Sequence, residues 1–270
     1  MLDKAVAEAA AKQDRWLVRA LDRAATRVLG RLLPQRMQLR AIGPLRALLY
    51  RGDRVECPCC GGRFRHFLPY WNRLDCVCPR CFSHERHRAL WLYLRERTDL
   101  FERDGTLLHF APEEVFARRF AAQPNLRYVS ADLAHPLAIE HFDITRIPHP
   151  DESFDFILCN HVLNEVPDDR RAMRELERVL RPEGWAIVMV PLDHDRAETL
   201  EDPAITTPEQ RREAYLEPGN LRRYGRDFAG RLRDAGWTVR VDRYVSELDA
   251  TAIARYGLLP IDDVFFCTKS

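Results

Sequence analysis

Four cysteines have the residue type and the spacing of a metal site. They form two C-x2-C pairs with 17 residues between the pairs: Cys57, Cys60, Cys78 and Cys81. Two short loops that each offer two thiolates can close tetrahedrally around one Zn²⁺. We therefore expect a small zinc ribbon whose metal is structural, because protein ligands fill all four coordination positions. A pair of structural disulfides is the alternative.

Neighbouring side chains could compete with these four ligands. Cys59 and Cys76 lie beside the two pairs, and His84 or His87 could replace one thiolate. The spacing favours the four cysteines, so we expect the other side chains to be unbound neighbours. The first 20 residues contain neither the apolar core nor the cleavage site of a secretory signal, which argues against disulfides. Reduced cysteines in a zinc site then predict a cytoplasmic location.

Composition indicates a globular chain with a basic N-terminal segment. Of the 270 residues, 46% are apolar and 31% are charged. No apolar run approaches the roughly 20 residues that a membrane span needs, so we expect none. Residues 1–55 carry 12 Lys and Arg against 5 Asp and Glu. This asymmetry fits either an arm that meets an acidic partner or a helix docked on the body with a solvated basic face.

Apolar periodicity predicts helices first and then alternating strands and helices. The N-terminal part reads as helices over 3–29, over 37–50 with a break near Gly43–Pro44, and over 83–97 with Ser83 as N-cap. From residue 105 onward, strands are expected over 106–110, 126–130, 154–159, 185–190, 238–244 and 264–268, and helices over 113–122, 169–180 and 224–235. Nearly all-apolar strands joined by helices predict an α/β, doubly wound sheet with Rossmann-like topology.

The predicted domains follow this organisation. A helical basic segment spans 1–53, the ribbon 54–85, a linker helix 86–103, and the α/β domain 104–270. A polar insertion over 191–220 is expected to form a lid that governs substrate choice.

Polar side chains follow the predicted strands at their carboxyl ends, where such sheets bind ligands. Asp132 follows the second strand about 20 residues after the first turn, a position from which a carboxylate can accept hydrogen bonds from ribose hydroxyls. Asp143 could meet an exocyclic amino group. The alternative for both aspartates is a turn or strand-end cap.

Residues 150–191 resemble the class I S-adenosylmethionine-dependent methyltransferases. The similarity runs from Asp151-Glu152-Ser153-Phe154-Asp155 through Asn160-His161 to the Arg178-Val179-Leu180-Arg181-Pro182-Glu183-Gly184 turn. More closely, the chain resembles a bacterial branch with a Cys-Pro-x-Cys zinc module, an HxAPE first loop at 109–113 and an RxYGxDF segment at 222–228. Taken this way, the resemblance covers about 54–268 of the sequence.

The resemblance implies S-adenosylmethionine as cofactor and a set of residues around it. The cofactor-binding residues carried over are His109, Ala111, Glu113, Asp132, Leu133, Asp143, Ile144, Asn160 and His161. His161 and Glu165 are the candidate catalytic bases. The first loop departs from the family's glycine-rich pattern, because the chain has no glycine between Gly105 and Gly184.

The expected function is methyl transfer to an unidentified small-molecule acceptor. One alternative is an RNA methyltransferase whose ribbon and basic arm contact phosphates, which would give binding that weakens steeply with salt. A second alternative is a catalytically inactive scaffold. The sequence does not define an oligomeric state.

Overall fold

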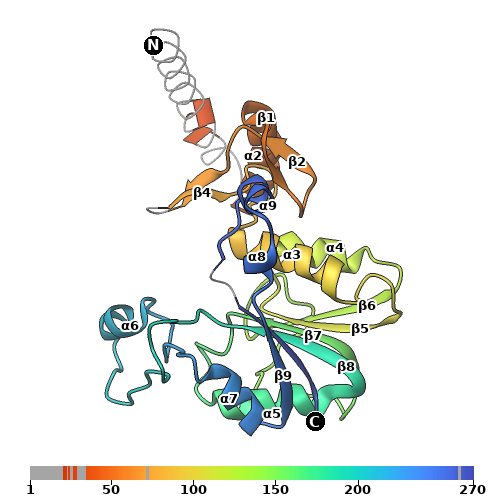
Figure 1. The fold of residues 1–270 in the computed structure, drawn as a ribbon, viewed down its shortest axis with the longest axis vertical. Coiled ribbons are helices and arrows are strands. Elements are labelled where there is room, and N and C mark those ends of the chain that lie inside the picture. Colours follow the sequence, from red (N-terminus) through yellow and green to blue (C-terminus); the bar gives the residue numbers. More distant parts are fainter. Residues whose placement is uncertain (1–20, 23, 25–26, 29–34, 71–72, 261–262) are drawn as a thin grey trace. The chain divides into compact units, whose positions relative to one another are not determined.

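Six strands form one mixed sheet in the larger of two compact units (Figure 1). Their order across the sheet is β6 (Leu126–Ala131), β5 (Gly105–Phe110), β7 (Phe154–Asn160), β8 (Leu180–Met189), β10 (Val264–Lys269) and β9 (Trp237–Asp242). The first four strands are parallel, and β10 runs antiparallel to both β8 and β9. The expected doubly wound, Rossmann-like sheet is confirmed.

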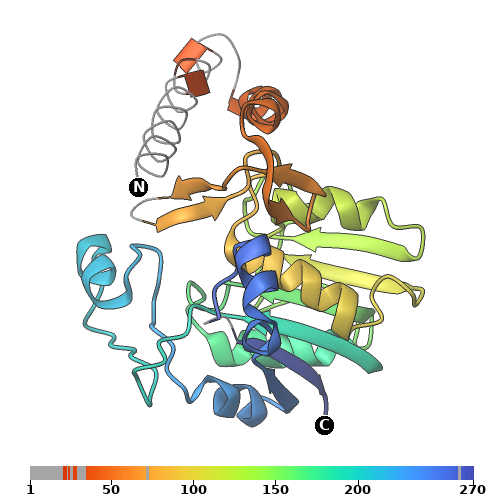
Figure 2. The ribbon, with the colours of Figure 1, turned by 45° about the horizontal axis from the view of Figure 1, so that its top comes forward.

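Helices cover both faces of this sheet. Figures 1 and 2 show α4 (Glu114–Ala121) on one face, with α5 (Asp169–Val179) and α7 (Phe228–Asp234) on the other. Helix α5 begins where the Asp168 carboxylate accepts a hydrogen bond from the amide of Arg171 at 2.9 Å, a side-chain N-cap. The insertion contains α6 (Pro208–Tyr215), and the short α8 (Tyr244–Glu247) follows β9.

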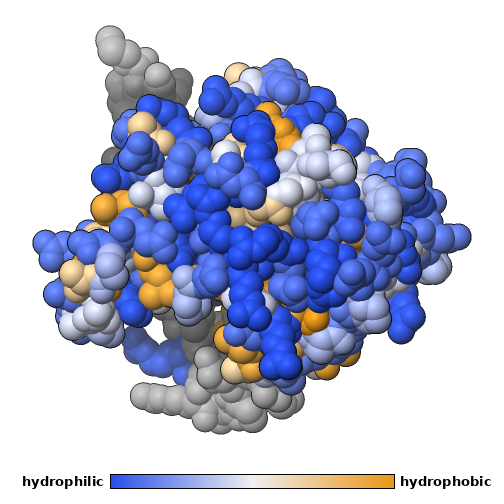
Figure 3. Space-filling model, turned by 90° about the horizontal axis from the view of Figure 1, so that it is seen from below, coloured by the Kyte–Doolittle hydropathy of each residue, from blue (hydrophilic) through white to orange (hydrophobic). Residues whose placement is uncertain are grey.

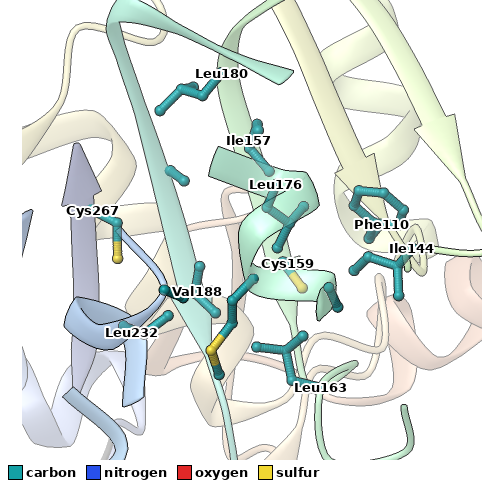
Figure 4. Packing of buried hydrophobic residues seen from close by; sticks show 14 of the residues in the cluster. Phe110, Ile144, Ile157, Cys159, Leu163, Leu176, Leu180, Val188, Leu232 and Cys267 are labelled. Carbon is teal, nitrogen blue, oxygen red and sulfur yellow. The ribbon is translucent and has the colours of Figure 1, made fainter. Parts of the chain in front are cut away.

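The core of the larger unit lies between the sheet and the α5–α7 layer. Strand residues such as Ile157 and Val188 pack there against Leu176 of α5 and Leu232 of α7 (Figure 4). All four side chains are fully buried. Helices on both faces bury both sides of the central strands, and residues 156–159 of β7 accordingly form a continuous apolar run.

The computed structural model describes residues 21–22, 24, 27–28, 35–70, 73–260 and 263–270. Residues 1–92 and 248–259 form one compact unit, and residues 93–247 and 260–270 form the other. The helix expected over 3–29 lies largely outside the described residues. Where it is described, Asp22 is buried, accepting from Arg46 Nε at 2.6 Å and from the Tyr50 hydroxyl at 3.2 Å.

In its described residues, the smaller unit contains two short hairpins with helices packed around them. Strand β1 (Arg51–Cys57) pairs with β2 (Gly62–Phe64), and β3 (Leu68–Tyr70) pairs with β4 (Arg73–Val77). Figure 2 shows these two ladders in orange. Around them lie α2 (Gln35–Leu49), the first turns of α3 (Glu85–Arg97), and α9 (Ala250–Tyr256), which contacts β1.

Three local predictions differ from the structure. Helix α2 continues through Pro44 without the expected break. Helix α3 begins at Glu85, so Ser83 is not its N-cap; the Ser83 hydroxyl instead lies 3.2 Å from Cys57 Sγ. The helix expected from residue 224 begins only at Phe228, because Tyr224 is extended and bridges to Leu192.

The face drawn in Figure 3 is mostly hydrophilic, with small separate hydrophobic spots. Single exposed apolar side chains of this kind are normal on protein surfaces. None of the helices in the described parts combines the length and apolar character that a membrane crossing requires.

Candidate functional site

The carboxyl ends of β5 and β7 meet where the strand order reverses. From β5 the chain proceeds to β6 on one side and then crosses to β7 on the other side. Open α/β sheets bind ligands in the crevice outside such a switch point. The loops that leave Phe110 and Asn160 begin there, so these loops define the candidate site.

The first loop adopts a backbone conformation that favours glycine, although it contains none. Ala111 has a φ of 47°, in the left-handed region. Its amide donates to the carbonyl of Ala131 at 2.9 Å, which ties the loop to the end of β6. A left-handed alanine costs about 1–2 kcal/mol relative to the right-handed region. The turn that a glycine-rich loop would make is therefore still made here, with strain at one residue.

A buried hydrogen-bonded chain presents the Glu113 carboxylate beside this loop. His109, on β5, is fully buried, with its Nδ1 3.0 Å from the Tyr128 hydroxyl and its Nε2 2.6 Å from Glu113 Oε2. Burial raises the pKa of Tyr128, so the phenol keeps its proton and can donate to Nδ1. In the tautomer that accepts from Tyr128 at Nδ1, Nε2 donates to Glu113 Oε2. The carboxylate is fixed by this contact.

Asn160 and His161 end the neighbouring strand. Asn160 is buried, and its Oδ1 has no hydrogen-bond partner among the described residues, while its Nδ2 lies 3.5 Å from Glu113 Oε1. A buried acceptor without a donor is unfavourable unless a ligand or water supplies one. His161 has a φ of 56°, and its amide donates to Met189 at 2.7 Å. The chain thus turns sharply at the site.

Asp132 and Asp143 hold their own loops. Asp132 Oδ1 accepts from the amides of Ala134 and His135 at 2.9 and 2.8 Å, and Asp143 Oδ1 accepts from Thr145 at 2.8 Å. Both aspartates therefore stabilise a turn, which was the alternative to cofactor binding. These hydrogen bonds use only one carboxylate oxygen of each aspartate.

Leu133 and Ile144 differ in burial: the first side chain is exposed and the second is buried. Leu133 is 71% exposed on the loop after β6. Ile144 is buried in the core cluster with Phe110 (Figure 4), so its side chain belongs to the core and only its backbone remains for a ligand.

Glu165 lies on the loop after β7, within the electrostatic reach of two other carboxylates. Desolvation raises the pKa of Glu165, and the negative charges of Asp132 and Glu217 raise it further. A Cβ placed on Gly219 would lie 3.5 Å from the Glu165 carboxyl carbon. Residues from two other segments, the loop after β6 and the end of the insertion, therefore lie near this side chain, which remains exposed to solvent.

The end of the insertion clamps the loop that carries Glu165. Arg222 is 1% exposed and donates to the carbonyls of Leu163, Val166 and Pro167 at 2.7, 2.5 and 3.0 Å. It also pairs with Glu201 at 2.7 Å, inside the insertion. This clamp was not anticipated, although Arg222 begins the RxYGxDF segment.

An amide pair reinforces this clamp. Asn164 Nδ2 donates to Asn220 Oδ1 at 2.7 Å, and the Leu221 amide donates to the Asn164 carbonyl at 2.7 Å. Both asparagines are buried. The insertion and the loop after β7 therefore form one hydrogen-bonded assembly.

The four cysteines of the two C-x2-C pairs converge in the smaller unit. All four Sγ atoms lie within 4.8 Å of one another, with 3.6 Å between Cys57 and Cys81 and 3.7 Å between Cys60 and Cys78. Thiolates around Zn²⁺ at about 2.3 Å would lie about 3.8 Å apart in a tetrahedron. The sulfur positions therefore match a tetrahedral zinc site.

All eight cysteines of the chain are described, and none forms a disulfide. Hydrogen bonds from neighbouring thiols, first that of Cys59, lower the pKa of Cys57 well below its ordinary value. Burial raises the pKa of Cys78. Cys59 is not one of the four converging cysteines, and its Sγ also lies 3.6 Å from the His87 carbonyl.

Comparison with known proteins places the sheet in a functional context. Residues 96–188 match the family model described as "Methyltransferase domain". This range includes β5, β6, β7, α5 and most of β8, and so includes the carboxyl ends of β5, β6 and β7. The chain is thus similar to methyltransferase domains over this part of the sheet.

Curated relatives are similar over short stretches. The chain is 38% identical over 58 residues to a demethylmenaquinone methyltransferase of Listeria monocytogenes, covering 22% of this chain and 24% of that protein. It is 37% identical over 60 residues to a 27-O-demethylrifamycin SV methyltransferase of Amycolatopsis mediterranei, covering 22% of each. The chain thus spans less than a quarter of the length of these relatives.

Solved structures are similar to this chain only at low sequence identity. An S-adenosylmethionine-dependent methyltransferase from Mesorhizobium loti is 16% identical with a TM-score of 0.48, covering 66% of this chain and 97% of that one. The [4+2]-cyclase SpnF is 17% identical with a TM-score of 0.49, covering 79% and 91%.

Proposed function

We propose that this protein transfers a methyl group from S-adenosylmethionine to a small-molecule acceptor. The observation that carries the proposal is that two acceptors lie together at the switch point: the buried Asn160 Oδ1, which has no hydrogen-bond partner among the described residues, and the fixed Glu113 carboxylate. Acceptor oxygens in that position suit a cationic donor such as the α-ammonium of a methionine group. The methyltransferase match over residues 96–188 covers both side chains.

The remaining cofactor contacts follow from the same edge of the sheet. Asp132 would accept from the ribose hydroxyls through Oδ2, because Oδ1 already holds its loop. Asp143 would meet the adenine amino group in the same way. When bound, the cofactor supplies a sulfonium methyl group that an acceptor atom displaces. The residues fit such a ligand at both its ammonium end and its ribose.

The chain's own contribution to the reaction is orientation and proton removal. An acceptor held in line with the methyl group reacts much faster than one in solution, because the entropy of alignment is lost on binding. Glu165 has a raised pKa and so is a stronger base than an ordinary carboxylate once ionised. We propose that Glu165 acts as the general base that removes the proton from the acceptor. His161 is the other candidate for this role.

The acceptor is proposed to be a small molecule because the insertion is fastened to the loop after β7. Arg222 and the Asn164–Asn220 pair fasten the loop on either side of Glu165, whose own side chain stays exposed. A loop held in this way keeps the carboxylate in one position beside a bound acceptor. The curated relatives are named for small-molecule acceptors, demethylmenaquinone and demethylrifamycin.

Labelled methyl transfer tests this proposal. Purified protein with methyl-labelled S-adenosylmethionine is incubated either with a deproteinised small-molecule extract or with total RNA. Label in the small-molecule fraction that disappears with Asp132→Ala supports the proposal. Label confined to RNA, with transfer falling steeply as salt rises, supports the RNA alternative instead. No transfer to either fraction, with no cofactor bound, supports the inactive scaffold.

We also propose that the four cysteines hold one structural Zn²⁺. Four protein thiolates leave no open position, so the ion would stabilise the smaller unit and take no part in methyl transfer. A reduced quartet supports the expected cytoplasmic location. Strong chelation should release the zinc and unfold the hairpins together, seen as a coincident change in metal content and circular dichroism. Full zinc loss with an unchanged spectrum contradicts a structural role.

A further inference from the structure

A second group of metal-ligating side chains lies in the smaller unit, separate from the cysteine quartet. It consists of Cys76 at the end of β4 and of His84 and Glu85 at the start of α3. One ligand atom from each lies within 4.8 Å of the other two. Cys76 and Glu85 are buried, and His84 is partly exposed.

The distances are close to those of a coordination shell. Cys76 Sγ lies 3.6 Å from His84 Nδ1. A sulfur at about 2.3 Å and a nitrogen at about 2.1 Å from one Zn²⁺ would lie about 3.6 Å apart in a tetrahedron. Cys76 Sγ lies 2.8 Å from Glu85 Oε2, so the carboxylate needs to open by less than about 1 Å to share an ion with the thiolate.

Surrounding groups orient these ligands. Arg73 Nη1 lies 3.1 Å from Glu85 Oε1, which leaves Oε2 directed at Cys76. Arg88 is fully buried and donates through Nη1 to the carbonyls of Cys76 and Ser83 at 2.9 and 2.8 Å. It therefore fixes the end of β4 against the start of α3. Such outer contacts are typical of metal sites, where they orient the ligands.

The two groups are interleaved in the sequence but use different residues. Cys78 and Cys81 belong to the quartet, and the Ser83 hydroxyl lies 3.4 Å from Cys81 Sγ. Cys76 precedes Cys78 by two residues, and His84 follows Ser83. The ligands are thus segregated into one set of four thiolates and one mixed sulfur, nitrogen and oxygen set.

We propose that Cys76, His84 and Glu85 form a second site that binds Zn²⁺. A thiolate, an imidazole and a carboxylate are all zinc ligands, and three of them leave one coordination position for water or an exogenous ligand. The Cys76 thiol loses its proton to solvent when the ion binds, so the charges of the thiolate and the carboxylate balance the ion. Without metal, the same thiol donates to the Glu85 carboxylate.

Metal content of the full chain tests this site. After equilibration with excess Zn²⁺ and desalting, wild type should retain two ions per chain. Glu85→Gln, which keeps the shape of the side chain, should weaken the second site by at least about tenfold, and Cys76→Ala should leave one ion. Cys59→Ala is the matched control, because that buried thiol lies outside both groups, and it should retain two.

Cobalt substitution gives an independent measure that does not depend on the variants folding. Titration of metal-free wild type with Co²⁺ should show two steps, one with strong thiolate charge-transfer absorption and one with much weaker absorption from a single thiolate. A single step with one ion per chain overturns the proposal. So does retention of two ions in both Cys76→Ala and Glu85→Gln.

Discussion

Glu113 Oε2 lies 2.6 Å from His109 Nε2. This contact is the second of two consecutive hydrogen bonds, of which the first joins the Tyr128 hydroxyl to His109 Nδ1. The histidine is fully buried on β5, and Glu113 lies on the loop that follows this strand. Their contact therefore holds a carboxylate at the carboxyl end of β5, beside the candidate site.

Replacing Glu113 should weaken cofactor binding. Glu113→Gln keeps an oxygen that can accept from His109 but removes the charge that faces the ammonium group. Charge-assisted hydrogen bonds contribute about 1.5–3 kcal/mol, so calorimetry should show affinity for S-adenosylmethionine reduced roughly ten- to hundredfold. Glu114→Gln is the control, because its exposed side chain pairs with Arg118 at 2.6 Å, and it should bind as wild type does. Equal affinity of both variants would remove Glu113 from the site.

The strain at Ala111 predicts opposite effects for two small substitutions. Ala111→Gly should fold and bind cofactor at least as well as wild type, since glycine adopts a φ of 47° without strain. Ala111→Val should lose about 1–3 kcal/mol of unfolding free energy, because a β-branched residue resists this region. Ala134→Val, at an exposed position whose φ is not positive, should change stability little. Denaturant titration measures all three, and an unaffected Ala111→Val would contradict the left-handed turn.

Arg222 should be a major determinant of stability for the insertion. Arg222→Met removes the donor to three carbonyls and leaves Glu201 without its buried partner. Breaking such a buried network costs about 3–5 kcal/mol, which urea denaturation would detect. The exposed Arg226, whose side chain contacts the carbonyl of His194, provides the control. Arg226→Met should lie within about 0.5 kcal/mol of wild type; a similar loss in both variants would show that Arg222 has no special role.

The raised pKa of Glu165 predicts a pH-dependent gain in stability on its removal. The folded state binds this proton more tightly than the unfolded state, so ionisation of Glu165 reduces stability as pH rises above the ordinary carboxyl pKa. Glu165→Gln should therefore stabilise the protein at neutral pH, and the gain should vanish as pH falls below about 4. Thermal unfolding of both proteins from pH 4 to pH 8 measures the difference. A gain that is the same at every pH would contradict the shift.

Local sequence patterns were sufficient to predict the strands of the large sheet and the convergence of the four cysteines. The nearly all-apolar strand around Ile157 and the C-x2-C pairs carry their signal within a few residues, and the structure has both. Contacts between distant residues could not be predicted in this way. Tyr224 was expected to begin a helix, but its hydroxyl donates to Asp169 at 2.8 Å across 55 positions and its backbone stays extended.

The same limit applies to the candidate site. The sequence predicts which residues follow the strands, because parallel strands bring their carboxyl ends to one edge. It does not indicate that His109 fixes Glu113, nor that Arg222 clamps the loop after β7. Each of these depends on side-chain direction and burial, which spacing alone does not define. Ser83 shows the same effect, since its hydroxyl turns to the cysteines and leaves the helix without the expected cap.

Calorimetric titration with S-adenosylmethionine shows most directly whether this cofactor binds at the switch point. Wild type should bind one cofactor per chain. Asp132→Asn keeps an oxygen that can hold the loop through Ala134 and His135 but removes the charge facing the ribose, and it should bind at least about tenfold more weakly. If wild type does not bind, or if Asp132→Asn binds as tightly as wild type, S-adenosylmethionine does not bind at the switch point as proposed.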